Sequence, residues 1–340
     1  MLTDEQRIQR AVNAINKQVL VKLCYAESPD CDPQYLRAHS ISNKRILMSV
    51  AENGNLLSVR IGLDRINTGA ITEPIGRGKS STFTGMCKKH DQIFFPIDDQ
   101  PYTPGNQTQE FLFAYRAAAR EYYTKTVQLR GTHHLIGIAR GTIEPPADVD
   151  LGHVLGNQAL ISHYEQLASA TEEALGVMGE HRQYLNSLAK SKSYHRIQSQ
   201  TITLNQKCGI AASTGFLPYT DLEGNVINDL LTTNFTRARP LYMTIFPQYN
   251  KTYVILSHQA RNSRIMGPLV NQIHAQDQER QCVIITNFII IGCENIFFTP
   301  SYWDSLPTSI RQSFLRHFYE DVDSPGTKLI VNDSLDIFAN

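Results

Sequence analysis

The chain of 340 residues carries 32 basic and 32 acidic residues, so its formal net charge is zero, and 41% of its residues are hydrophobic. These totals are typical of a globular protein with a real core, and they exclude a molecule that binds polyanions over its whole surface. No run approaches about 18 consecutive apolar residues, and the N-terminus lacks the apolar segment of a signal peptide. We therefore expect a cytoplasmic protein without a membrane partner, in which the six cysteines serve metal binding or packing and not disulfides.

The first hundred residues are expected to form short elements separated by turns. Apolar spacing, turn residues and Pro96 give the following order: a helix over 4–18, a strand over 19–25, a turn at 28–30, a short helix or turn over 42–54, a strand over 56–63, a Gly/Ser/Thr-rich loop with at most a piece of strand over 69–84 and two helical turns over 88–95 that Pro96 stops.

The rest of the chain changes from helical to β-rich texture near residue 197. The expected elements are an amphipathic helix over 107–130, a break at 145–150, helical structure over 151–194, strands from 197 onward, a helix over 264–277, a buried strand over 282–291 and a final helix near 307–320. The chain length is that of two or three domains. We predict an α+β fold with an N-terminal zinc-bound module (1–100), a helical middle (105–195) and a mixed α/β C-terminal domain (196–340).

Two couples of metal-ligand residues lie in the first quarter of the chain. Cys24 and Cys31 form a Cys-x6-Cys couple, and Cys87 and His90 form a Cys-x2-His couple. Sulfur and imidazole are the ligands that zinc prefers, and four of them close a tetrahedral structural site. The alternative is that Cys24 packs as a small apolar residue in a strand while Cys31 is a loop thiol. The sequence favours zinc, because the module is poor in aliphatic residues and needs another source of stability.

The order of these residues resembles the HNH endonucleases of the treble-clef (ββα-metal) type. Cys24 and Cys31 match the first zinc knuckle, and the segment Ala-His-Ser-Ile-Ser matches the hairpin that carries the catalytic histidine. Cys-Lys-Lys-His-Asp matches the second knuckle and the position that follows it. The resemblance covers roughly residues 20–98. Ala38 stands where the family places an acidic metal ligand.

The resemblance implies metal-dependent cleavage of nucleic-acid phosphodiesters. His39 would be the general base, and Asp91 would help to hold Mg²⁺ or another divalent cation beside the structural Zn²⁺. Two plainer roles remain open: His39 as a hairpin residue that bonds a backbone carbonyl or replaces a zinc ligand, and Asp91 as a carboxylate favoured by a helix N-terminus. Bacterial phage-defence and mobile-element proteins often join such a nuclease to another domain, which is an analogy at the level of the fold.

Local charge indicates a nucleic-acid partner for this module. Nine basic residues and three acidic residues lie between Pro33 and His90, an excess suited to a phosphate backbone. Solvated loop charges would give the same count. We expect DNA in preference to RNA, with residues 105–340 selecting the target, sensing a trigger or forming a homo-oligomer. The rival hypothesis is a non-catalytic zinc-finger protein that mediates nucleic-acid or protein interactions, and Ala38 favours it.

Overall fold

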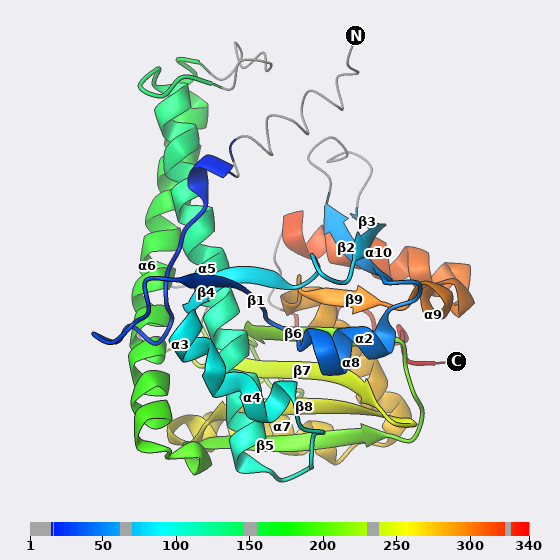
Figure 1. Ribbon diagram of the computed structural model, residues 1–340. Coiled ribbons are helices and arrows are strands. Elements are labelled where there is room, and N and C mark those ends of the chain that lie inside the picture. Colours follow the sequence, from blue (N-terminus) through cyan, green and yellow to red (C-terminus); the bar gives the residue numbers. More distant parts are fainter. Residues whose placement is uncertain are drawn as a thin grey trace.

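The computed structural model describes residues 15, 17–61, 70–145, 155–229, 238–323 and 328–339. One large antiparallel sheet forms the centre of this mixed α+β fold, and the two longest helices lie side by side along it and extend beyond it (Figure 1). A small two-stranded sheet crosses the face on which the first of these helices lies.

Seven strands form the large sheet in the order β3-β2-β9-β6-β7-β8-β5, and β1 pairs with β4 in the small sheet. Each of these pairings is antiparallel. The strands are β1 (Tyr35–His39), β2 (Asn55–Ile61), β3 (Ala70–Gly76), β4 (Thr82–Cys87), β5 (Ile197–Leu204), β6 (Ile210–Phe216), β7 (Leu241–Gln248), β8 (Lys251–Gln259) and β9 (Ile296–Phe298).

The longer helices are α5 (Gln107–Ala139), α6 (Gln158–Ser191), α7 (Ser263–His274), α8 (Gln278–Gly292) and α10 (Thr308–Asp323). The shorter helical pieces are η1 (Asn43–Leu47), α2 (Met48–Val50), α3 (Lys88–Asp91), η3 (Gln92–Phe94), α4 (Phe95–Asp98), η4 (Tyr194–Arg196), η6 (Ala260–Asn262) and α9 (Pro300–Ser305). The side chains of Asn106 and Asn157 accept hydrogen bonds from backbone N–H groups in the first turns of α5 and α6, which fixes where both helices begin.

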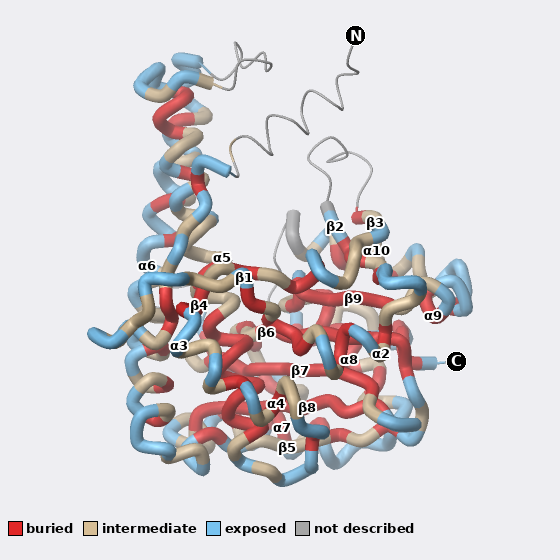
Figure 2. The backbone as a smooth tube through the Cα atoms, viewed as in Figure 1, coloured by how far each residue is buried: buried red, intermediate tan, exposed pale blue. Residues whose placement is uncertain are grey.

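The central strands are buried on both faces, which explains their continuous apolar sequences. On β7, Tyr242 and Phe246 belong to the core shared with α5, whereas Met243 and Ile245 belong to the core shared with α7 and α8. Successive strand residues point to opposite faces, so a strand covered on both sides has no polar face to show. Figure 2 shows this burial concentrated in the sheet, with much of α6 exposed.

The strand expected over 282–291 is a helix, α8. Asp277 caps its first turn by accepting a hydrogen bond from the backbone N–H of Arg280 at 2.8 Å. The helix is buried over most of its surface, so apolar residues recur without the 3.6-residue period that identifies an amphipathic helix. A short run of buried residues does not by itself distinguish a strand from a helix.

Three expectations for the N-terminal region were also wrong. Residues 20–24 are not a regular strand, although the N–H of Tyr25 donates to the carbonyl of Gly85 at 2.8 Å and so joins this segment to β4. The loop expected over 69–84 contains β3 and the start of β4. Pro96 does not stop the helical turns, because it lies in the first turn of α4, where a missing N–H costs no hydrogen bond.

Several other expected elements are confirmed. The turn at 28–30 is closed by a hydrogen bond from the N–H of Cys31 to the carbonyl of Ser28 at 3.1 Å. The expected short helix, the strand after it and the later helices and strands match η1–α2, β2, α5, α6, β5 to β8, α7 and α10. The expected helix over 4–18 and the break at 145–150 lie mostly outside the described residues.

The sheet runs across the boundary expected near residue 100. β2 and β3 come from the segment assigned to the N-terminal module, and β2 pairs with β9 of the C-terminal region. The division into 1–100, 105–195 and 196–340 stays a prediction about folding units. Among the residues that the structure describes, no helix combines the length and apolar character that crossing a bilayer requires.

Candidate metal centre and the adjoining cavity

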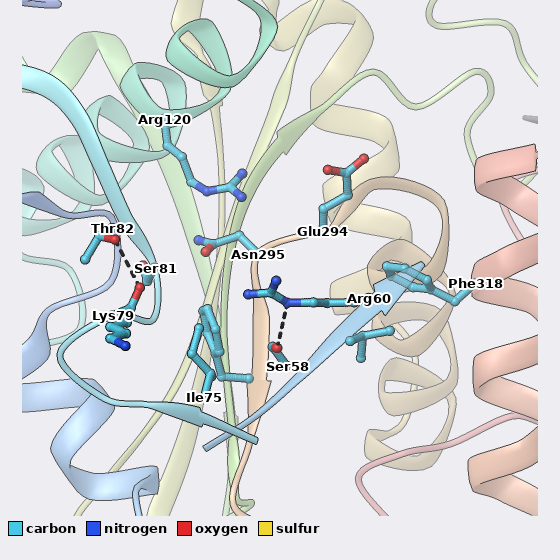
Figure 3. Close-up of a pocket in the computed structure, with 12 residues that line it drawn as sticks. Ser58, Arg60, Ile75, Lys79, Ser81, Thr82, Arg120, Glu294, Asn295 and Phe318 are labelled. Atoms are coloured by element: carbon cyan, nitrogen blue, oxygen red, sulfur yellow. Dashed lines mark hydrogen bonds between the residues drawn. The ribbon is translucent and has the colours of Figure 1, made fainter. Parts of the chain in front are cut away.

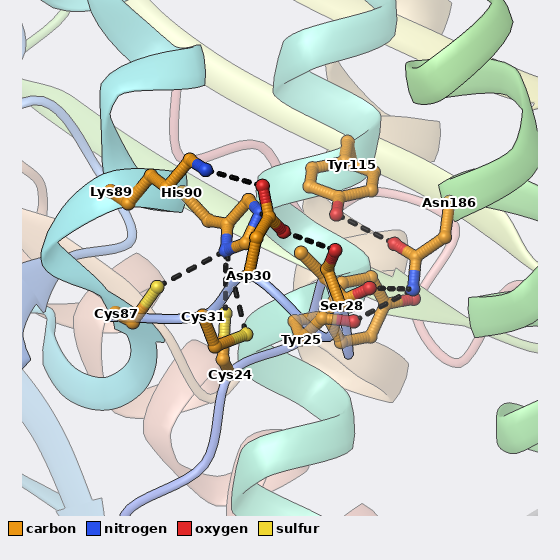
Figure 4. A network of polar contacts seen from close by, with 11 residues as sticks. Cys24, Tyr25, Ser28, Asp30, Cys31, Cys87, Lys89, His90, Tyr115 and Asn186 are labelled. Atoms are coloured by element: carbon orange, nitrogen blue, oxygen red, sulfur yellow. Dashed lines mark hydrogen bonds and ion pairs between the residues drawn. The ribbon is translucent and has the colours of Figure 1, made fainter. Parts of the chain in front are cut away.

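The four residues predicted to bind metal lie together. Cys24 and Cys31 flank the turn before β1, Cys87 ends β4, and His90 follows in α3. Their ligand atoms all lie within 4.8 Å of one another. The three sulfur atoms surround Nδ1 of His90, at 3.1 Å from Cys87, 3.5 Å from Cys31 and 3.6 Å from Cys24 (Figure 4).

This arrangement suits a tetrahedral ion. Zinc binds sulfur at about 2.3 Å, so neighbouring ligand atoms on a tetrahedron lie about 3.8 Å apart. One imidazole nitrogen offers a single proton or a single lone pair, and it cannot satisfy three sulfurs by hydrogen bonding alone. An ion between the four atoms satisfies all of them. Asp30 lies 3.5 Å from Nε2 of His90 and can orient the ring from its other side.

Helix α6 holds the first knuckle in place. The guanidinium of Arg182 donates to the carbonyls of Cys24 at 2.7 Å and Tyr25 at 2.8 Å. The amide of Asn186 also donates to the carbonyl of Tyr25, and its Oδ1 accepts the hydroxyl proton of Tyr115 (Figure 4). These bonds order the backbone around Cys24 and so help to position its sulfur in the cluster.

The thiols of the cluster differ in acidity. Burial raises the pKa of Cys24 to about 12. At Cys87 burial also acts upward, but hydrogen bonds from the backbone of His90 and of Asp32 and from the His90 side chain outweigh it and lower the pKa to about 7. A thiolate is the form that binds metal, so Cys87 is suited to be the first ligand to lose its proton.

His39 is the last residue of β1, and its side chain lines a cavity. Its Nδ1 lies 2.9 Å from the carbonyl oxygen of Ser80, so Nδ1 carries the proton and Nε2 is left as the basic nitrogen. A cavity of 320 Å³ adjoins the ring, and its polar lining residues are Arg37, His39, Ser42, Asn43, Lys44, Asp91, Asp98 and Arg116. The structure therefore brings His39 and Asp91, both predicted from the sequence, to one cavity.

Burial shifts the pKa of both predicted residues toward the neutral form. It lowers the pKa of His39, an effect that the positive charge of Arg116 reinforces, so the imidazole is neutral at pH 7. It also raises the pKa of Asp91. Asp91 makes no ion pair within the described part of the chain, so its oxygens remain available to a cation. Asp98 differs, because its two oxygens accept from Nη1 of Arg116 at 2.8 Å and from Nη2 at 2.5 Å.

Two polar atoms of the cavity lining are buried without a hydrogen-bond partner among the described residues. They are the Nε donor of Arg116 and the Oδ1 acceptor of Asn43. Arg116 is 3% exposed, and its guanidinium also lies over the ring of Phe94, 4.1 Å from the centroid. A buried polar group without a partner costs free energy, and both atoms are buried and unsatisfied in this structure.

Sequence reasoning did not identify Arg116 and Asn43. Arg116 lies in the middle of α5, and its contact with α4 depends on how the two helices pack. An arginine on an otherwise apolar helix face was the available signal. The remaining cysteines are buried in the core that the large sheet shares with α7 and α8, and they are Cys208, Cys282 and Cys293.

Comparisons of the chain with protein-family models, with curated proteins and with solved structures found no match.

Proposed function

We propose that this protein cleaves nucleic-acid phosphodiesters with His39 as the general base, in a cavity that Asp91 supplies with oxygen ligands for a divalent cation. The observation that carries the proposal is the bond between Nδ1 of His39 and the Ser80 carbonyl, because it directs the basic Nε2 to the remaining side of the ring. His39 and Asp91 line the same cavity. The proposal includes Zn²⁺ as the structural ion of the four-residue cluster.

The cavity offers the groups that such a reaction needs. Neutral Nε2 of His39 takes a proton from water, the water oxygen bonds to phosphorus, and the bond from phosphorus to the departing sugar oxygen breaks. Arg116 also lines the cavity, but Asp98 engages its two terminal nitrogens and its Nε is buried. Arg37 and Lys44 line the same cavity and add positive charge. A bound Mg²⁺ would neutralise charge on the phosphate, and oxygen ligands such as Asp91 are those it prefers.

The four-residue cluster is connected to this cavity through neighbouring residues of the chain and through paired strands. His90 and Asp91 are neighbours in α3, and Cys87 ends the strand β4 that pairs with β1. An ion held by the four residues of the cluster would fix α3 against the two-stranded sheet of β1 and β4. It would thereby also fix the distance between Asp91 and His39. The ion is thus proposed to be structural, since four protein ligands leave no open position.

Plasmid nicking tests the proposal. Wild-type protein should nick supercoiled DNA with Mg²⁺, Mn²⁺ or Ni²⁺, and His39→Ala should lower the rate by about 10² to 10⁴. The matched control is His133→Ala, because His133 lies on the exposed side of α5, where it pairs with Glu172 at 3.1 Å. Full activity in His39→Ala would refute the assigned base.

The rival function is a zinc-finger module that binds a partner without cleaving it. The engagement of Asp98 by Arg116 favours this reading, since it removes one carboxylate from the ligands available to a cation. Ala38 supplies no carboxylate in its place. Absence of cleavage with every metal, together with retained nucleic-acid binding, would favour the rival.

A further inference from the structure

A second cavity of 460 Å³ lies between the start of β4, the strand β2, helix α5 and the segment before β9. Figure 3 shows Arg120 and Arg60 reaching from opposite sides toward Asn295. Lys79 and Ser81 line the cavity from the turn before β4. This volume falls within the range of small-molecule sites, which is roughly 300–1,000 Å³.

The lining carries more positive than negative charge. Arg60, Lys79 and Arg120 come from three separate parts of the chain, and Glu294 is the acid among the lining residues. Arg120 pairs with Glu121 at 3.0 Å, whereas the half-exposed Arg60 lies 4.0 Å from Glu73. Lys79 has no ion pair within the described ranges. Two of the three cations are therefore weakly compensated, and an anion between them would gain from both.

Apolar groups form another part of the wall. Val59, Ile75, Phe297 and Phe318 line the cavity together with the charged residues. A cavity that joins cations to aliphatic and aromatic side chains suits a ligand with a phosphate at one end and a flat, less polar group at the other. Nucleotides have this chemistry, and inorganic anions do not.

The floor of the cavity is a rigid polar network. The amide of Asn295, which is 1% exposed, donates to the hydroxyl of Ser40 and to the carbonyl of Ser213, at 3.1 Å in each case. The hydroxyls of Ser40 and Ser81 lie 2.6 Å apart, and Ser81 also accepts from the N–H of Ile41 at 2.8 Å. Ser81 has a φ of 57°, a left-handed conformation that costs free energy in a residue other than glycine.

This network connects the cavity to His39. The strained residue Ser81 follows Ser80, whose carbonyl accepts from His39, and Ser40 follows His39 directly. Residues at the end of β1 and around the start of β4 therefore connect the two cavities. Thr82 illustrates the same closeness, because it lines the second cavity and accepts from Nε of Arg37, which lines the first.

We propose that the second cavity binds the phosphate of a nucleotide unit, with Arg60 and Lys79 as its cationic ligands. The nucleotide unit is either part of the nucleic-acid strand whose cleavage is proposed above or a free mononucleotide. The strand source rests on the proposed function, whereas the phosphate site itself does not. Both sources share the same phosphate chemistry, and binding measurements separate them.

The test compares two double variants. Arg60→Gln/Lys79→Gln removes two exposed cations of the cavity, and Lys190→Gln/Lys251→Gln removes two exposed cations elsewhere. Binding of a labelled 20-base-pair DNA duplex is followed by fluorescence anisotropy over a series of salt concentrations, without added divalent cation. Binding of AMP is measured by calorimetry on the same proteins. Circular dichroism confirms that all of them are folded.

Each outcome decides the matter. If the strand supplies the phosphate, the cavity variant binds DNA about tenfold more weakly than the control and its salt dependence falls by about two ions. If a free nucleotide supplies it, AMP binds to wild-type protein, the cavity variant loses that binding, and DNA affinity matches the control. Equal behaviour of the two variants toward both ligands, or no binding of either ligand by wild-type protein, overturns the phosphate site. Nicking is not part of the readout, so an inactive protein that still shows either loss would contradict the proposed function alone.

Discussion

The six cysteines divide into two groups with opposite environments. Cys24, Cys31 and Cys87 converge on His90 beside the small two-stranded sheet. Cys208, Cys282 and Cys293 are dispersed through the apolar core of the large sheet. Burial raises the pKa of Cys282 and of Cys293 to about 12, so these thiols stay protonated. A cysteine's role therefore follows from its neighbours: hydrogen-bond donors and other ligand residues make one group suited to metal, and hydrocarbon makes the other group packing residues.

The largest effect is expected from breaking the first group. Cys87→Ser should reduce bound zinc from about one ion per chain to nearly none. It should also unfold the region around β1 and β4, because metal affinity and folding of such a site are coupled. Elemental analysis and thermal unfolding measure both effects. Cys282→Ala is the matched control, since it removes a buried thiol from the other group. Full zinc content in Cys87→Ser would exclude Cys87 as a ligand.

A core substitution probes the other side of the comparison. Ile245→Ala on β7 removes a side chain that is 0% exposed, and it should lower the free energy of unfolding by about 2–5 kcal/mol. This loss should be the same with and without a chelator, because no proposed metal ligand touches that core. Urea unfolding in both conditions gives the answer. If the loss in free energy of unfolding changes when the metal is removed, the stability of the large core depends on the metal cluster.

The same contrast explains what the sequence could reveal about the site. The four ligands were recognisable because each couple is local, and short spacing limits how far apart two side chains can lie. His39 and Asp91 were found by their places relative to those couples. Arg116 and Asn43 were not found. Arg116 reaches the cavity only because α5 packs against the two-stranded sheet, and Asn43 reaches it because of the turn at η1. Local pattern carries no information about such tertiary contacts.

The fold shows the same limit. Helix α5 and the strands β5 to β8 were expected because apolar residues at helical spacing, or β-branched composition, leave a clear pattern. The amphipathic character expected of α5 is wrong for residues 109–119, which are all buried. Helix α8 was mistaken for a strand because its buried residues form a short run rich in isoleucine. β3 was expected to be mostly loop because its alanine, glutamate, proline and glycine residues are depleted in strands, and its pairing with β2 supplies the order that its composition lacks.

The two regions also contain histidines, the half-buried His39 and the buried His258, that should respond differently to acid. Burial lowers the pKa of His39 and of His258 below the ordinary value of 6.5. Each therefore contributes stability that is present above pH 6.5 and is lost as the pH falls toward the lowered pKa. His39 alone should also control activity, so the nicking rate should fall with acid from a midpoint below pH 6.5, approaching about tenfold per pH unit. A rate profile of wild-type protein from pH 5 to 8 measures this, and a midpoint above 6.5 would contradict the assignment.

The smallest effect on stability is expected at Lys44, which lines the His39 cavity and forms an exposed ion pair with Asp99. The Lys44 side chain is 73% exposed, so water and salt screen the pair, and Lys44→Gln should change the free energy of unfolding by less than about 1 kcal/mol. Its positive charge lies beside a cavity that is proposed to receive phosphate, so Lys44 can attract the substrate in addition to pairing with Asp99. Lys44→Gln should therefore raise KM for DNA while leaving urea unfolding nearly unchanged, whereas Lys251→Gln should alter neither. A loss of stability without any change in KM would place the role of Lys44 in the fold and weaken the case for phosphate in that cavity.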